Sequence, residues 1–224
     1  VTAHADSFLK IEVEEDIGPK TKGYYCSVIA ILMLFLELSK EDSEKWISKI
    51  LGTIDLIPDI AKTTKQWYES EKEELKRFKN IIVIGYDKCL PAATEGALKI
   101  LETVQCCVRY YELEEFMHGI YHGIDKSTLI LALGNQSRHL NRMVRLLGYL
   151  KEHKNATTYL ISQNKVIKHD FSYPFIEDSL FVSFEYLTVL QVLGELMCHD
   201  RGVDLYDTVD ENFHEYMESY VYEK

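Results

Sequence analysis

Glu102 and His118, a carboxylate and an imidazole sixteen residues apart, have the side chains needed for proton transfer. A carboxylate can remove a proton from a reacting group, and an imidazole titrates near neutral pH and can deliver one. Lys99 lies three residues before Glu102, so on a helix these two side chains share a face. Taken singly, Lys99 and Glu102 are typical of exposed helix positions, because charged residues usually face water. Spacing alone is therefore weak evidence of an acid–base site.

The second half of the chain has the pattern of an α/β sheet that would position these residues. Residues 81–84 are a continuous β-branched run that ends at Gly85, which is typical of a strand buried on both faces. Further strands are predicted at 108–111, 127–133 and 157–161, and helices at 92–106, 136–151 and 178–199. Alternation of this kind predicts a parallel sheet in a three-layer αβα sandwich.

Ligands bind beyond the carboxyl ends of the strands in open parallel sheets. The first such loop here, residues 85–92, contains neither GxGxxG nor GxxxxGK[ST]. It is therefore not a nucleotide loop of either kind.

The first eighty residues predict an incomplete unit followed by helices. Residues 8–13 alternate like a half-buried strand, and 20–39 read as an apolar core helix. One strand and one helix cannot form a core alone, so we expect them to close a larger unit that begins upstream. Residues 60–79 have few apolar positions, which predicts a helix that bridges two lobes.

Composition narrows the classes of partner. The 224 residues include 25 Lys and Arg against 36 Asp and Glu, a formal net charge of −11. A net anion without a segregated basic patch is not expected to bind nucleic acid or an anionic membrane. The longest apolar run, 28–36, is shorter than the ~20 residues of a membrane-spanning helix, and no secretory signal is visible. Five scattered cysteines are typical of free thiols in a reducing cytoplasm, where we expect the protein.

His118 and His122 have the spacing of two metal ligands on a helix. Gly119 and Gly123 interrupt that helix, so we predict no metal site and no cofactor.

Two motifs together resemble a known family. Residues 95–102 read EGALKxxE, and residues 115–119 read ExxHG. The pair is similar to the second sugar-isomerase (SIS) domain of the glucosamine-6-phosphate synthase and fructosamine-6-phosphate deglycase family. Residues 16–22 resemble the EIG…STK segment that ends the first SIS domain, although one residue shorter, and residues 191–204 resemble the family's last helix and tail.

The resemblance implies a division of the chain into four segments and a role for each of three site residues. Residues 1–57 would be a remnant of a first SIS domain, 58–79 a connecting helix, 80–200 the second SIS domain and 201–224 a tail. In the family, the glutamate matching Glu102 moves protons at the sugar's C1 and C2, and the lysine matching Lys99 positions the sugar. The histidine matching His118 comes from the neighbouring subunit and opens the ring or protonates the leaving amine, which implies a homodimer.

Two departures from the family pattern shape the functional prediction. The synthases form a Schiff base through a lysine where this chain has Arg201, and a guanidinium stays protonated and is no nucleophile. The turn at Arg201 borders the sugar in this fold, so it is a candidate substrate contact. The family's SxSGxT phosphate loop is absent from these 224 residues. Either the sequence is a fragment or the protein has lost its phosphate anchor, and we expect a fragment.

The resemblance therefore implies an enzyme that binds a phosphorylated sugar or amino sugar. The main prediction is a deglycase that cleaves a 6-phosphorylated fructosamine to a hexose 6-phosphate and an amine. The alternatives are a phosphosugar isomerase or aminotransferase of the glucosamine-6-phosphate synthase type and a non-catalytic sugar-phosphate sensor.

Overall fold

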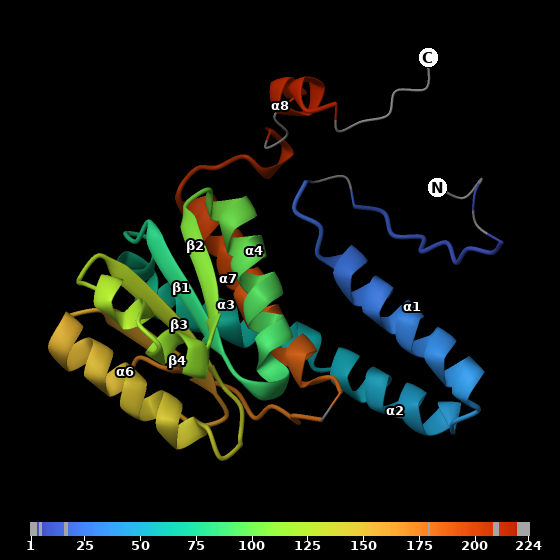
Figure 1. Ribbon diagram of the computed structural model, residues 1–224, viewed down its shortest axis with the longest axis horizontal. Helices are drawn as coiled ribbons and strands as arrows, with labels where there is room; N and C mark the ends of the chain where they lie inside the picture. Colours follow the sequence, from blue (N-terminus) through green and yellow to red (C-terminus); the bar gives the residue numbers. More distant parts are fainter. Residues whose placement is uncertain (1–3, 5, 16–17, 179, 208–210, 219–224) are drawn as a thin grey trace.

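A five-stranded parallel sheet with helices on both faces forms the body of the protein (Figure 1). The computed structural model describes residues 4, 6–15, 18–178, 180–207 and 211–218. The strand order is β2-β1-β3-β4-β5. The strands are β1 (Asn80–Gly85), β2 (Cys107–Glu112), β3 (Thr128–Gly134), β4 (Thr157–Ser162) and β5 (Phe171–Ser172). This confirms the predicted αβα sandwich, to which the structure adds the short β5.

The alternation of side chains along β1 builds both layers of the core. Ile81 and Val83 pack in one apolar cluster, whereas Ile82 and Ile84 pack in the other. A strand directs successive side chains to opposite faces, so a run of four apolar residues fills two cores at once. The register places Ile82 beside Arg109 of β2 and Ile130 of β3.

In the part of the chain that the structure describes, three helices cover one face of the sheet and two cover the other. The helices α3 (Ile57–Leu75), α4 (Leu90–Val104) and α7 (Val182–Asp200) contribute to the first cluster, and α5 (Leu113–Met117) and α6 (Leu140–Lys154) contribute to the second. The short 3-10 turns are η2 (Asp87–Cys89), η3 (Ile120–Gly123) and η4 (Leu205–Asp207), and α8 (Glu211–Tyr216) follows them. The sequence patterns did not predict α5, which is only five residues long.

Helix α3 belongs to the core, contrary to the expectation of a bridging helix with little buried surface. Ile60, Tyr68 and Leu75 are buried in the first cluster. Trp67 packs edge-on against Tyr159 and donates a hydrogen bond from Nε1 to the His169 carbonyl at 2.8 Å. The few apolar positions of this helix are sufficient because they fall on one stripe, which faces α7 and the sheet.

The first two helices extend to the side of the sandwich in Figure 1. They are α1 (Lys22–Ser39) and α2 (Ser43–Ile54). The helix predicted at 20–39 is confirmed, but its placement in a core is not, because Leu36 is its one buried residue. The exposed apolar side chains of α1 are Val28, Ile31, Met33, Leu34, Phe35 and Leu38. By length and composition α1 is also long and apolar enough to cross a membrane, which for a single helix is weak evidence.

The strand predicted at residues 8–13 is wrong. These residues have no regular secondary structure, and Phe8 and Leu9 are exposed. A strand needs a neighbour to satisfy its backbone groups, and no strand of the described chain lies beside this segment.

The close packing of α4 on α7 gives a test of the fold. A Cβ added at Gly96 would lie 2.8 Å from the Leu190 Cβ. We expect Gly96→Ala to lower the free energy of unfolding by about 1–3 kcal/mol, because an added methyl overpacks this contact. Urea unfolding of the variant and the wild type measures the change.

Gly148→Ala in α6 is the matched control. A Cβ at Gly148 meets no atom within 4 Å, so alanine is expected to stabilise the helix by roughly 0.5–1 kcal/mol. Equal effects of the two substitutions would contradict the close approach of α4 and α7.

Candidate functional site

Helix α4 carries an acidic–basic–acidic stripe. Glu95, Lys99 and Glu102 are spaced four and three residues apart, so all three lie on one face of the helix. The Lys99 Nζ lies 2.6 Å from the Glu102 Oε2 and 3.6 Å from the Glu95 Oε1. One ammonium group therefore bridges two carboxylates, and the stripe carries one net negative charge when all three groups are ionised.

The three side chains differ in exposure. Lys99 is 5% exposed, so its charge depends on the two carboxylates for compensation. The Glu102 side chain is 33% exposed and remains within reach of a ligand. The stripe thus consists of a fixed buried cation and an accessible carboxylate.

Glu95 has the clearest electrostatic perturbation of the stripe. Burial raises the pKa of Glu95, the Lys99 ammonium opposes this shift, and the Glu102 charge adds to it. Perturbed carboxyl groups are common at functional sites. Sequence reasoning did not select Glu95 as a site residue, although its position one turn before Lys99 was the available signal.

The start of α1 lies beside this stripe. Burial, together with the charge of Glu95, raises the pKa of Tyr24. The neighbouring Tyr25 hydroxyl lies 3.0 Å from the Thr188 Oγ1 of α7 and donates to the Phe184 carbonyl. The stripe is therefore positioned where α4, α7 and the first turn of α1 meet.

The segment that resembles EIG…STK leads into this first turn. Glu15 accepts hydrogen bonds from the backbone N–H groups of Thr21, Lys22 and Gly23 at 2.6–2.8 Å. The carboxylate thus caps α1 with the charge that a helix N-terminus favours. Asp16 and Ile17 of the same segment lie outside the described residues.

His118 lies far from this stripe within one chain. Glu102 is in the last turn of α4, which leads to the amino end of β2, whereas His118 follows α5, beyond the carboxyl end of β2. The six residues of β2 separate the two positions by about 20 Å. His118 is exposed. A single chain therefore brings Lys99 and Glu102 together but leaves His118 at the other end of the sheet.

Arg201 follows the end of α7 and holds the end of α3. Its Nη2 donates to the Lys76 carbonyl at 2.9 Å and to the Phe78 carbonyl. Burial raises the pKa of the nearby Cys106 thiol, and the Arg201 charge opposes this shift. These contacts join Arg201 to the backbone of the fold, and the described residues show none between it and Lys99 or Glu102.

The histidine pair with metal-ligand spacing does not lie on one helix. Helix α5 ends at Met117, and His122 belongs to η3. In the described ranges, no three side chains among His, Cys, Asp and Glu form a group that could hold a metal ion.

Comparison with known proteins identifies the fold that carries this stripe. Residues 74–166 match the family model of the SIS domain. This chain contains a SIS domain. The match begins at the end of α3 and includes all of α4, so Glu95, Lys99 and Glu102 lie within the SIS domain, whereas Arg201 lies beyond the match.

Relatives of known name agree with this assignment. The chain is 26% identical over 196 residues to the glutamine–fructose-6-phosphate aminotransferase (isomerizing) of Wigglesworthia glossinidia brevipalpis, and the match covers 83% of the chain but 32% of the relative. It is 23% identical over 184 residues to the enzyme of the same name from Sulfolobus acidocaldarius, and this match covers 82% of the chain and 30% of the relative. The chain thus spans about a third of the length of these curated relatives.

Solved structures show the same architecture. A Clostridium difficile 630 protein described as a phosphosugar isomerase superposes with a TM-score of 0.83 at 30% identity, over 92% of this chain and 60% of the other. The C-terminal domain of the glucosamine-fructose-6-phosphate aminotransferase from Francisella tularensis superposes with a TM-score of 0.66 at 18% identity, over 87% of this chain and 57% of the other. At 18% identity, the likeness to the Francisella tularensis domain shows a shared fold alone.

The bridging lysine gives a test of the site. We expect Lys99→Met to raise the pKa of Glu95 further, because the substitution removes the one charge that opposes burial. NMR titration of the Glu95 side-chain carboxyl carbon measures the shift. Lys72→Met, at an exposed pair with Glu69 on α3, is the control and should leave the Glu95 pKa unchanged.

The same variant should change the pH dependence of stability. The Glu95 pKa is raised above 4.5 in the folded chain, so the folded state holds this proton more tightly than the unfolded state. The free energy of unfolding therefore falls as pH rises from about 4.5 through the folded pKa. Lys99→Met should enlarge this fall, and an unchanged profile in urea unfolding would contradict the bridge.

Proposed function

We propose that this chain supplies the sugar-reacting groups of a cytoplasmic SIS enzyme that acts on a phosphorylated sugar. The hydrogen-bonded pair of Lys99 and Glu102 carries the proposal, because it combines a fixed cation with an accessible carboxylate on the motif that resembles EGALKxxE. The relatives support a phosphosugar substrate, since their names specify fructose 6-phosphate or a phosphosugar. The specific reaction that we propose is deglycation of a 6-phosphorylated fructosamine.

Glu102 would act as the general base in this reaction. Its carboxylate removes the proton from C1 of the ketosamine and returns a proton to C2, which leaves an imine between C1 and the amine nitrogen. Water adds to C1 of this imine and forms a carbinolamine. Its C1–N bond then breaks, which releases the hexose 6-phosphate and the free amine. The Lys99 ammonium would hold the Glu102 carboxylate in place and hydrogen-bond the sugar. Proton transfer by a positioned group contributes about 10²–10⁴ in rate.

His118 of a second copy would protonate the departing nitrogen. The exposed position of His118, about the length of β2 away from Glu102, supports an arrangement in which two chains share each site. A two-fold homodimer would then contain two equivalent sites, each with a base from one chain and an acid from the other.

Arg201 favours deglycation over amination. The aminotransferase route that we expect from the family needs a lysine amine to form an imine with the sugar, and a protonated guanidinium cannot replace it. The hydrogen bonds to the Lys76 and Phe78 carbonyls also hold Arg201 in the fold. Contact between Arg201 and the substrate stays a prediction.

The second candidate is a phosphosugar isomerase or aminotransferase, which the names of the curated relatives favour. It would use the same base for proton transfer between C1 and C2. The two candidates differ in the fate of nitrogen, because the aminotransferase adds an amine and the deglycase releases one.

The roles of Glu102 and His118 predict complementation between inactive variants. Glu102→Gln and His118→Asn should each lower turnover by at least a hundredfold. Mixing the two variants under conditions that exchange subunits should restore up to roughly a quarter of wild-type activity, because half of the dimers are mixed and each has one intact site. Mixing either variant with itself is the control. Absence of recovery would contradict a shared site, and near-normal rates in either variant would refute its role.

Substrate assays separate the two candidates. With a fructosamine 6-phosphate, the proposed deglycase should release free amine and a hexose 6-phosphate in equal amounts. With fructose 6-phosphate and ammonia, it should form no glucosamine 6-phosphate above the level of the Glu102→Gln variant. Glucosamine 6-phosphate formation without amine release would instead select the aminotransferase.

A further inference from the structure

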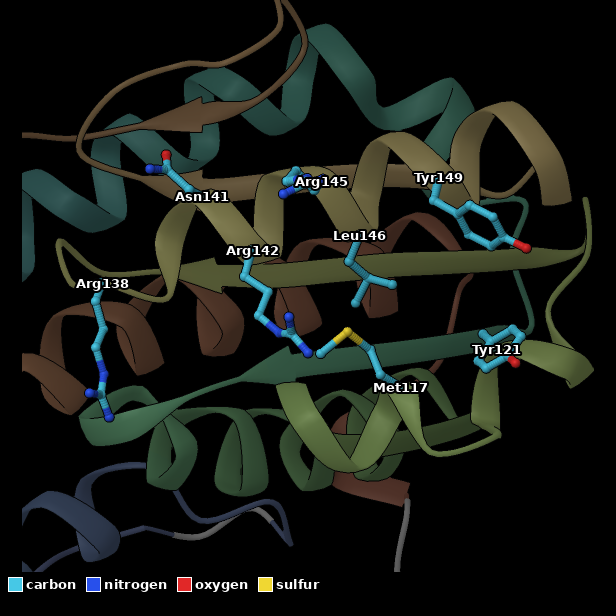
Figure 2. A pocket seen from close by; sticks show the side chains of 8 residues that line it. All are labelled: Met117, Tyr121, Arg138, Asn141, Arg142, Arg145, Leu146 and Tyr149. Carbon is cyan, nitrogen blue, oxygen red and sulfur yellow. The ribbon is translucent and has the colours of Figure 1, made fainter.

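A basic groove lies on the face of the sheet opposite α4, between α6 and the α5–η3 segment (Figure 2). Its volume is about 630 Å³, which is within the usual range of small-molecule sites. The lining side chains are Met117, Tyr121, Arg138, Asn141, Arg142, Arg145, Leu146 and Tyr149. The helices on this face pack in the second apolar cluster, so the groove is separate from the stripe on α4.

Three arginines give the groove its charge. Arg142 and Arg145 lie on α6, Arg138 lies in the turn just before that helix, and none of the described residues that line the groove is acidic. Glu114 neutralises one of them, since it pairs with the Arg142 Nε at 2.5 Å and Nη2 at 2.8 Å. Within the described part of the chain, Arg145 has no ion pair. In a protein with a net charge of −11, this cluster of like charges is a local electrostatic cost that a bound anion would relieve.

Two tyrosines form the other end of the groove. The rings of Tyr121 and Tyr149 lie 6.5 Å apart at 85°, and Figure 2 shows them together at the end away from Arg138. Tyr149 is 45% exposed, so it presents a ring surface to solvent. Exposed aromatic rings beside arginines can stack on planar bases, which contributes about 1–3 kcal/mol per base.

The arrangement along the helix sets the size and chemistry of the ligand. From Leu140, where α6 begins, to Tyr149 the helix rises about 14 Å, with the aromatic rings at one end of the groove and the guanidinium groups over the rest. Guanidinium forks bind phosphate oxygens in paired hydrogen bonds. We propose that this groove binds a nucleoside polyphosphate, with the base against Tyr149 and the phosphates on Arg142 and Arg145. The proposal does not rest on the sugar chemistry of α4.

Binding of ATP to the wild type and to single variants tests the groove. Isothermal titration calorimetry should give one site per chain for ATP. Arg145→Gln and Tyr149→Leu should each weaken ATP binding about tenfold, because they remove a phosphate contact and the stacking surface. Lys151→Gln is the matched control, since it removes one positive charge from the same helix outside the groove and should change affinity less than twofold.

Ligand pieces distinguish a nucleotide site from a general anion site. Tripolyphosphate and adenosine, titrated separately, should each bind at least tenfold more weakly than ATP, and tripolyphosphate should be insensitive to Tyr149→Leu. Circular dichroism should show that Arg145→Gln and Tyr149→Leu keep the fold of the wild type. Three results would each overturn the proposal. They are tripolyphosphate binding as tight as that of ATP, an ATP affinity that Arg145→Gln leaves unchanged, and the absence of saturable ATP binding.

Discussion

The parallel packing of α4 against α7 sets the positions of the groups on which the candidate site depends. Gly96 and Gly194 allow the approach, because a Cβ at either position would collide with the facing helix. With this face of α4 committed to α7, Glu95, Lys99 and Glu102 fall on an adjacent face, beside the first turn of α1. The buried charge of Lys99 then needs both carboxylates for compensation, and of the two Glu102 is the more accessible to a ligand.

The sheet was predictable from sequence because each central strand is a local signal. The β-branched run before Gly85 and the apolar run before Gly134 define β1 and β3 within one or two residues. Short or terminal features were less predictable. Helix α5 has five residues and no periodic pattern, and β5 has two residues that are recognisable only once β4 lies beside them.

Burial was less predictable than helix formation in the first eighty residues. The apolar composition of α1 indicated a helix correctly, but burial also requires a partner surface, and much of α1 remains exposed in this chain. The polar composition of α3 suggested exposure, yet one stripe that includes Trp67 and Leu75 is enough to join the core. For the candidate site, the pairing of Lys99 with Glu102 followed from helical spacing. The part played by Glu95 depends on burial, which spacing does not reveal.

In the shared site that we propose, the separation of Glu102 and His118 along β2 makes activity depend on the association of two chains. A site that needs one group from each of two chains exists only in associated molecules, so its abundance follows the square of the free monomer concentration when association is weak. Specific activity would then fall on dilution even though every molecule remains folded. The cellular concentration of the protein would thereby act as a control on its rate, without any effector.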